Sequence, residues 1–239
     1  MRSSVDLVTQ AEIKGQRVER CLRLIWQDEE TRQFIHVGVL WELLPLAFAF
    51  EYSDGARHPR FAPLPEFPDL ERLYSTDRLP AFFANRVMSP HRRSFGAYAD
   101  WLGVGDVPTP VEILARSGGR RSTDTFHVVE GFVPIHGRIE GSFFASGVRH
   151  IPGAKDRLLR MSSGDFLTLR REPSNPVNPL AVLLDAEPSQ PVGYVPDWLL
   201  TDLKQLNLEQ TSVRVERVNR DAPAHLQLLC RLSGEVLTP

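Results

Sequence analysis

Three prolines within residues 173–179 restrict the fold of this chain more than any other feature of its sequence. They separate two strand-like runs, one ending near Arg171 and the other beginning at Leu180. Proline has no backbone N–H and a fixed φ, so the segment between the runs cannot join a β-ladder. Asn175 and Asn178 alternate with the prolines, and asparagine is common in turns because its side chain hydrogen-bonds nearby backbone. The segment is therefore predicted to be a rigid connection that directs side chains outward.

The composition of the chain sets the number of domains and the class of protein. With 239 residues and 42% hydrophobic content, the chain can form one large domain or two of about 100 to 130 residues each. Cys21 and Cys230 are far apart in sequence, so we expect two buried free thiols and no disulfide framework. The longest apolar run, Val37 to Phe50, is interrupted by Glu42 and is shorter than the roughly 20 residues that span a bilayer. No signal peptide is recognised, so a cytoplasmic protein without membrane contact is expected.

The charge of the chain limits the kind of nucleic acid that it could bind. The formal net charge is −2, from 28 basic and 30 acidic residues. A protein that holds long duplex DNA through phosphate contacts usually carries a basic excess. Any nucleic-acid binding is therefore expected to be local, at an end or on a short single strand.

Residues 19–125 show the pattern of a small sheet with helices. An acidic turn at Asp28 to Glu30 joins two alternating runs, which is typical of a β-hairpin. A proline-rich segment at 56–70 is expected to be an ordered but irregular loop. The expected strands of this block are 21–26, 33–41 and 48–52, and the expected helices are about 76–83, 90–102 and 110–115.

Several segments of this block resemble the N-terminal subdomain of the HipA family of bacterial toxin kinases, which makes it a HipS-like module. The matching residues are Phe50-x-Tyr52, the proline-rich residues 63–68, the run 80–86 and the run 114–119. No catalytic Asp of a kinase loop and no glycine-rich nucleotide cradle follows. The resemblance implies an antitoxin-like or regulatory partner of a HipA-type kinase in a bacterial toxin–antitoxin system, and not a kinase.

The second block, residues 126–239, is predicted to be a small β-barrel with one helix. Many short strands with turn residues between them favour a barrel over a parallel sheet. The expected helix covers about 196–206, and its Leu199, Leu200 and Leu203 share one face. The expected strands are 125–130, 142–149, 166–172, 180–186, 191–195, 212–218 and 225–232.

Three motifs of the second block resemble the HIRAN domain over about residues 140–235. They are the runs 147–150 (GVRH), 171–182 (the proline loop) and 192–195 (VGYV). The resemblance implies binding of DNA, particularly the free 3′ end of a single strand. It assigns Arg149 to phosphate, His150 to base stacking, Arg171 to the flank of the groove, and Asn175 and Asn178 to hydrogen bonds with the terminal sugar or base.

Two alternatives remain open for these residues. The asparagine side chains can bond their own backbone and so build the loop, and Arg149 can pair with Glu172 at the surface. Val177 stands where base stacking would favour an aromatic residue. These alternatives would leave the block as a peptide-binding adaptor that has lost nucleic-acid binding, and a further alternative is a DNA-repair or nuclease accessory factor.

Catalytic and metal sites are not expected. None of the seven histidines has the spacing of a metalloprotease motif or lies beside a cysteine pair, and no nucleophile elbow is present. We therefore expect a non-enzymatic protein without catalytic residues, metal or cofactor. Phe61 and Phe67, in the loop 56–70, are the candidate partner-binding residues if that loop exposes them, although core packing is the default interpretation. The expected fold class is α+β, mostly β, with two domains at 19–125 and 126–239.

Overall fold

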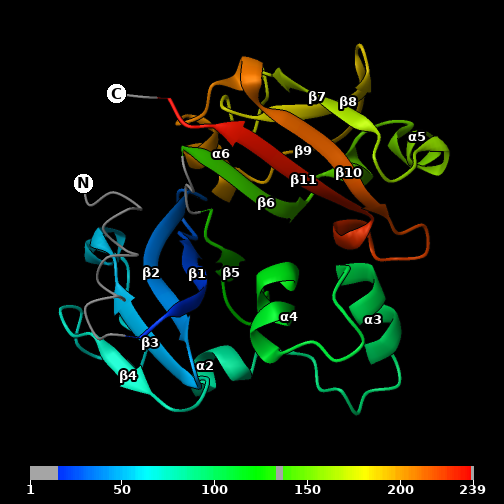
Figure 1. Cartoon of the computed structure of the whole chain (residues 1–239). Helices are drawn as coiled ribbons and strands as arrows, with labels where there is room; N and C mark the ends of the chain where they lie inside the picture. Colours follow the sequence, from blue (N-terminus) through cyan, green and yellow to red (C-terminus); the bar gives the residue numbers. More distant parts are fainter. Residues whose placement is uncertain (1–15, 133–136, 238–239) are drawn as a thin grey trace. The chain divides into compact units, whose positions relative to one another are not determined.

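The computed structural model describes residues 16–132 and 137–237 of the chain (Figure 1). It divides into two compact units: the first reaches Gly131 without residues 101–103, and the second comprises those three residues and the chain from Phe132 onward. Each unit contains one antiparallel sheet, and the described residues include five α-helices. The predicted class, α+β and mostly β, is confirmed.

The first unit is built on a five-stranded sheet with the order β4-β3-β2-β1-β5. The expected hairpin and third strand are confirmed, because β2 pairs in antiparallel register with β1 on one side and with β3 on the other. The strand placed at the start of the second block pairs with β1 instead, for example Leu24 with Val128, and so belongs to the first unit. The strands are β1 (Val18–Gln27), β2 (Phe34–Leu43), β3 (Ala47–Tyr52), β4 (Tyr74–Thr76) and β5 (Phe126–Glu130).

Short helices follow these strands in sequence. They are η1 (Asp54–Arg57), α2 (Ala81–Ala84), α3 (Phe95–Leu102) and α4 (Pro110–Ser117). α4 packs against β5 and begins with a capping box between Thr109 and Glu112. It ends at Gly118, whose φ of 74° is left-handed. α3 begins at Phe95 and not at Pro90, because the intervening residues form turns closed by backbone hydrogen bonds such as Arg92 N to Ser89 O.

The proline-rich loop 56–70 is part of the core of the first unit. Phe61 is only 9% exposed and Phe67 only 4%. The Tyr52 hydroxyl accepts the Leu64 N–H at 2.7 Å and donates to the Phe67 carbonyl at 2.9 Å, which holds the loop on the sheet. The expectation that this loop exposes Phe61 and Phe67 to a partner is therefore wrong, because burial of the two rings stabilises the fold.

The second unit is an open six-stranded sheet with the order β6-β11-β10-β7-β8-β9. The expected small barrel is not closed: Ser146, just after β6, meets Tyr194 at the end of β9 in one bridge, where the two residues exchange two backbone hydrogen bonds of 2.9 Å. β6 ends at Phe144, earlier than expected, since Gly147 has a φ of 66° and leads into a 3₁₀ turn. The strands are β6 (Arg138–Phe144), β7 (Phe166–Arg171), β8 (Val182–Glu187), β9 (Gln190–Tyr194), β10 (Ser212–Val218) and β11 (Leu228–Glu235).

The helices of the second unit differ from the single one expected. α5 (Ala154–Arg160) was not anticipated, and it buries only Ala154 and Leu158 beneath four charged residues. The helix expected at 196–206 is reduced to η3 (Asp197–Leu199) and α6 (Leu200–Leu203). The remaining 3₁₀ turns are η2 (Val148–His150), η4 (Leu208–Gln210) and η5 (Ala224–Leu226). Throughout residues 16–132 and 137–237, no helix combines the length and the apolar character needed to cross a membrane.

Candidate nucleic-acid interface

Tyr194, the last residue of β9, joins the three sequence motifs of the second unit. Its ring lies so close to Gly147 that a β-carbon there would come within 2.8 Å of it. Its hydroxyl donates to Glu172 Oε2 at 3.0 Å, and the Asn175 amide lies 3.5 Å from the same hydroxyl. Burial and then the Glu172 carboxylate raise the pKa of Tyr194, so the hydroxyl keeps its proton at neutral pH. The three segments, distant in sequence, therefore meet around one side chain.

The side chain of Asn175 builds the proline loop. Its Oδ1 accepts the backbone N–H groups of Val177 and Asn178 at 2.9 and 3.0 Å. Its Nδ2 donates to Glu172 Oε2 at 2.6 Å. Both ends of the amide are engaged within the loop, so contact with a ligand would require the exchange of an existing hydrogen bond.

Asn178 fixes the other end of the loop in the same way. Its Oδ1 accepts the Leu180 N–H at 2.9 Å, and its Nδ2 donates to Asp197 Oδ1 at 3.0 Å. These contacts tie the loop to η3. The geometry favours the alternative in which Asn175 and Asn178 shape the loop, and their direct contact with nucleic acid stays a prediction.

Two residues of the predicted site, Arg149 and His150, are exposed. Arg149 and His150 lie on η2, and the Arg149 Nε–H donates to His150 Nε2 at 2.9 Å. Glu172 is engaged by Asn175 and Tyr194, and not by Arg149 as the alternative had it. Arg149 therefore keeps its terminal nitrogens directed to solvent, where they can meet a phosphate.

Neighbouring arginines at the end of β7 have different roles. Arg170 forms a two-bond ion pair with the buried Asp185 across the strands, at 2.5 and 3.1 Å, and this hydrogen bonding raises the pKa of Arg170. Arg171 points to the opposite face, because successive side chains of a strand alternate. It is exposed, and with Lys204 it borders a hollow of about 150 Å³ that includes Leu180 and Leu203.

A basic segment that was not predicted lies beside the site. Residues 149–160 contain four basic residues against one acidic residue, Asp156. Arg157 fastens α5 to β9, with Nε donating to the Pro191 carbonyl at 2.9 Å. Lys155 and Arg160 remain exposed. The sequence shows this local cluster of basic residues, but the net charge of the whole chain does not reveal it.

Two other expectations concern Val177 and metal binding. Val177, where an aromatic residue would favour stacking, is 87% exposed at the tip of the loop. Among the residues that the structure describes, no three His, Cys, Asp or Glu side chains gather closely enough to hold a metal ion.

The comparisons with known proteins give one structural neighbour. No family model and no curated protein matches the chain. A solved structure that it resembles is the crystal structure of the HIRAN domain of human HLTF, with 17% sequence identity and a TM-score of 0.30. The alignment covers 42% of this chain and 76% of that one.

Proposed function

We propose that the chain is a non-enzymatic binding protein whose second unit holds single-stranded DNA, in particular a 3′ end. The binding surface would consist of η2, the proline loop and Tyr194. The observation that carries the proposal is the convergence of the three HIRAN-like motifs on Tyr194, with Arg149 and His150 exposed on η2 just after Gly147. Arg171 is exposed on the other face of β7.

The proposed roles follow from the chemistry of these side chains. The guanidinium group of Arg149 would pair with a phosphate through two N–H groups, and Arg171 would flank the groove. The His150 ring would stack on a base. Asn175 and Asn178 would keep the loop rigid, so that little conformational entropy is lost on binding. A chain with a net charge of −2 is suited to a short strand or an end and not to long duplex.

Fluorescence anisotropy of labelled single-stranded DNA with the whole chain tests the proposal. We expect micromolar or tighter binding at low salt, weakened several-fold when the 3′ end carries a phosphate. Arg149→Gln should weaken binding several-fold, whereas Arg231→Gln, which removes a surface ion pair with Glu140 on β11 and β6, should not. Equal binding of free and blocked ends would refute the end preference, and unchanged binding by Arg149→Gln would refute the site.

For the first unit we propose docking on a separately encoded HipA-type kinase, as an antitoxin-like or regulatory partner in a bacterial toxin–antitoxin system. The support is the sequence resemblance over residues 20–130. Copurification of such a kinase with the whole chain tests this proposal. Failure to bind any kinase encoded nearby would contradict it and leave the DNA-binding proposal untouched.

The second candidate function is a peptide-binding adaptor. The hollow beside Arg171 and Lys204 favours it, because several of the residues around it are leucines and valines and two cations border it. Binding of an apolar peptide there would depend little on salt, whereas phosphate contacts weaken steeply as salt rises.

A further inference from the structure

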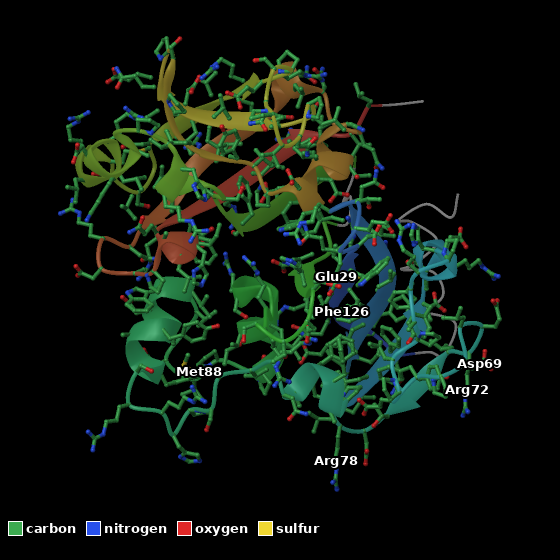
Figure 2. All side chains as sticks on the ribbon, turned by 180° about the vertical axis from the view of Figure 1, so that it is seen from behind. Glu29, Asp69, Arg72, Arg78, Met88 and Phe126 are labelled. Carbon is green, nitrogen blue, oxygen red and sulfur yellow. The ribbon has the colours of Figure 1, made fainter. Side chains whose placement is uncertain are left out.

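The first unit contains a second hollow, which the proposed function does not use. It has a volume of about 440 Å³, within the range of about 300 to 1,000 Å³ that is usual for ligand sites. Its walls come from the end of β1, the β1–β2 turn, the start of the proline-rich loop and β5. Figure 2 shows Glu29 and Phe126, two of its lining residues, close together.

Three aromatic rings form the wall of this hollow. Trp26 and Phe126 are direct partners in the β1–β5 ladder, and both are half-buried. Phe61 stands edge-on to both, with ring centroids 5.5 Å from Trp26 and 6.3 Å from Phe126. Phe61 is thus buried as a core residue and also lines the hollow. Faces of aromatic rings carry partial negative charge and attract cations.

The rim of the hollow is acidic. Asp28, Glu29 and Glu30 line it, against the single cation Arg60. Arg60 is bound by the Asp28 carboxylate through two hydrogen bonds and by Glu30 at 3.0 Å. The hydrogen bond from Arg60 also holds the pKa of Asp28 well below its usual range, so this carboxylate stays ionised. The rim therefore keeps a negative excess.

Glu29 supplies a carboxylate that the fold does not use. It is exposed, and no described residue forms a hydrogen bond or ion pair with it. Its neighbours Asp28 and Glu30 are both engaged by Arg60. An incoming cation would thus find one available carboxylate beside the aromatic wall.

We propose that this hollow binds an arginine side chain from a basic segment of a partner protein. A guanidinium group is planar and can lie against an aromatic ring while two of its N–H groups reach one carboxylate. A quaternary ammonium would leave the carboxylate acceptors unused, and an anion would be repelled by the rim.

The same combination already occurs next to this hollow, where the Arg86 guanidinium also lies 5.6 Å from the centroid of the wall ring Phe126. The Arg86 guanidinium lies 4.2 Å from the centroid of the Phe82 ring and forms an ion pair of 2.6 Å with Asp124. There the cation comes from the chain itself. In the hollow, the aromatic wall and Glu29 present the corresponding partners to a cation from outside.

Peptide binding to the whole chain tests the proposal. We would titrate a short labelled Gly/Ser peptide that contains two arginines, at low salt, beside matched peptides with citrulline or trimethyllysine in their place. Citrulline keeps the shape of arginine but has no charge, so we expect the arginine peptide to bind at least tenfold more tightly. Equal binding of the citrulline peptide, tighter binding of the trimethyllysine peptide, or no binding of the arginine peptide at millimolar concentration would overturn the proposal.

Variants at exposed positions locate the site without disturbing the core. Glu29→Gln should weaken the arginine peptide at least threefold, and Ala62→Lys, which places a cation at the exposed rim, should abolish binding. Asp77→Asn, at an exposed acid of the same unit outside the hollow, is the matched control and should bind as the unchanged chain does. Peptide binding that resists both rim variants would overturn the assignment. Arg149→Gln should leave peptide binding unchanged, which separates this site from the proposed DNA surface.

Discussion

Asn175 shows how one side chain can hold a binding loop in shape. Its amide makes two hydrogen bonds to backbone N–H groups and one to Glu172. We predict that Asn175→Ala lowers the free energy of unfolding by about 1 to 3 kcal/mol, because partly buried donors and acceptors lose their partners. Ser174→Ala, at an exposed neighbour, should change it by less than about 0.5 kcal/mol. Urea denaturation measures both values, and equal stability of the two variants would contradict the assigned role.

Loss of an ion pair should cost much more stability at Arg86 than at Arg57. The Arg86 side chain is 2% exposed, pairs with Asp124 and donates to the Gly119 carbonyl at 3.0 Å. Arg57 pairs with Glu71 at the surface, where both side chains are more than 60% exposed. Arg86→Gln should cost about 3 kcal/mol, because it leaves a charge without its partner in a buried network. Arg57→Gln should cost less than about 1 kcal/mol, and a similar loss in both variants by urea denaturation would be inconsistent with this difference.

At the scale of elements, the proline loop offers a test by gain of function. Val177 is 87% exposed at its tip, so a larger side chain fits there without strain. Stacking of a base on an aromatic side chain contributes about 1 to 3 kcal/mol. We therefore predict that Val177→Tyr tightens single-stranded DNA binding at least fivefold in anisotropy titrations. Val107→Tyr, at a position of the first unit that is 93% exposed, is the control, and an equal gain there would point to non-specific stacking.

Strands β2 and β5 each carry a histidine that makes the first unit sensitive to acid. Burial, together with the charge of Arg23 for His36 and of Arg120 for His127, lowers the pKa of each histidine to about 4. In the unfolded chain a histidine titrates near 6.5, so the unfolded state binds more protons between pH 6.5 and 4. Stability should be full above pH 6.5 and fall as the pH decreases towards 4.

Thermal unfolding as a function of pH measures this effect. The variant His36→Gln keeps a donor for the Gly38 carbonyl, which His36 Nε2 contacts at 2.9 Å, but it does not titrate. Its melting temperature should fall less than that of the unchanged chain between pH 6.5 and 4. A fall confined to pH below 4, where carboxylates such as Asp28 take up protons, would show that the histidines do not contribute.

The elements that could be predicted from sequence are those whose signals are local. Alternating residues predicted the β1–β2 hairpin, and the helix expected at about 110–115 lies within α4. The pairing of β5 with β1 could not be read in this way, since it joins residues about a hundred positions apart. α5 was missed because two buried residues give too weak a helical pattern. The open edge between β6 and β9 depends on the turn at Gly147, which sequence patterns do not resolve.

The candidate site was predictable in its parts but not in its connections. The motifs identified Arg149, His150 and Arg171, which are exposed in the structure. The central position of Tyr194 and its hydrogen bond to Glu172 required the folded sheet. From its sequence, Asn175 can be either a ligand contact or a loop-building residue, and its hydrogen bonds in the fold favour the second role.

At the scale of the whole molecule, charge predicts how salt acts on binding. The net charge of −2 provides no long-range attraction, so binding should depend on a few local phosphate contacts. Arg149 and the exposed Lys155 and Arg160 of the basic segment would make about three such contacts. Each releases about 0.7 counterion from a single strand, which predicts a slope of about −2 for log K against log salt. Anisotropy titrations at four salt concentrations measure it, and a slope near zero would favour the peptide-binding adaptor.

The three segments around Tyr194 are proposed to form one surface for single-stranded DNA. The most direct measurement is an NMR titration of the isotope-labelled whole chain with a short DNA strand that has a free 3′ end. We expect the amide chemical-shift changes to cluster in residues 147–150, 171–180 and 192–197, and to become smaller when the 3′ end is blocked. Shifts confined to the first unit, or scattered without a cluster, would contradict it.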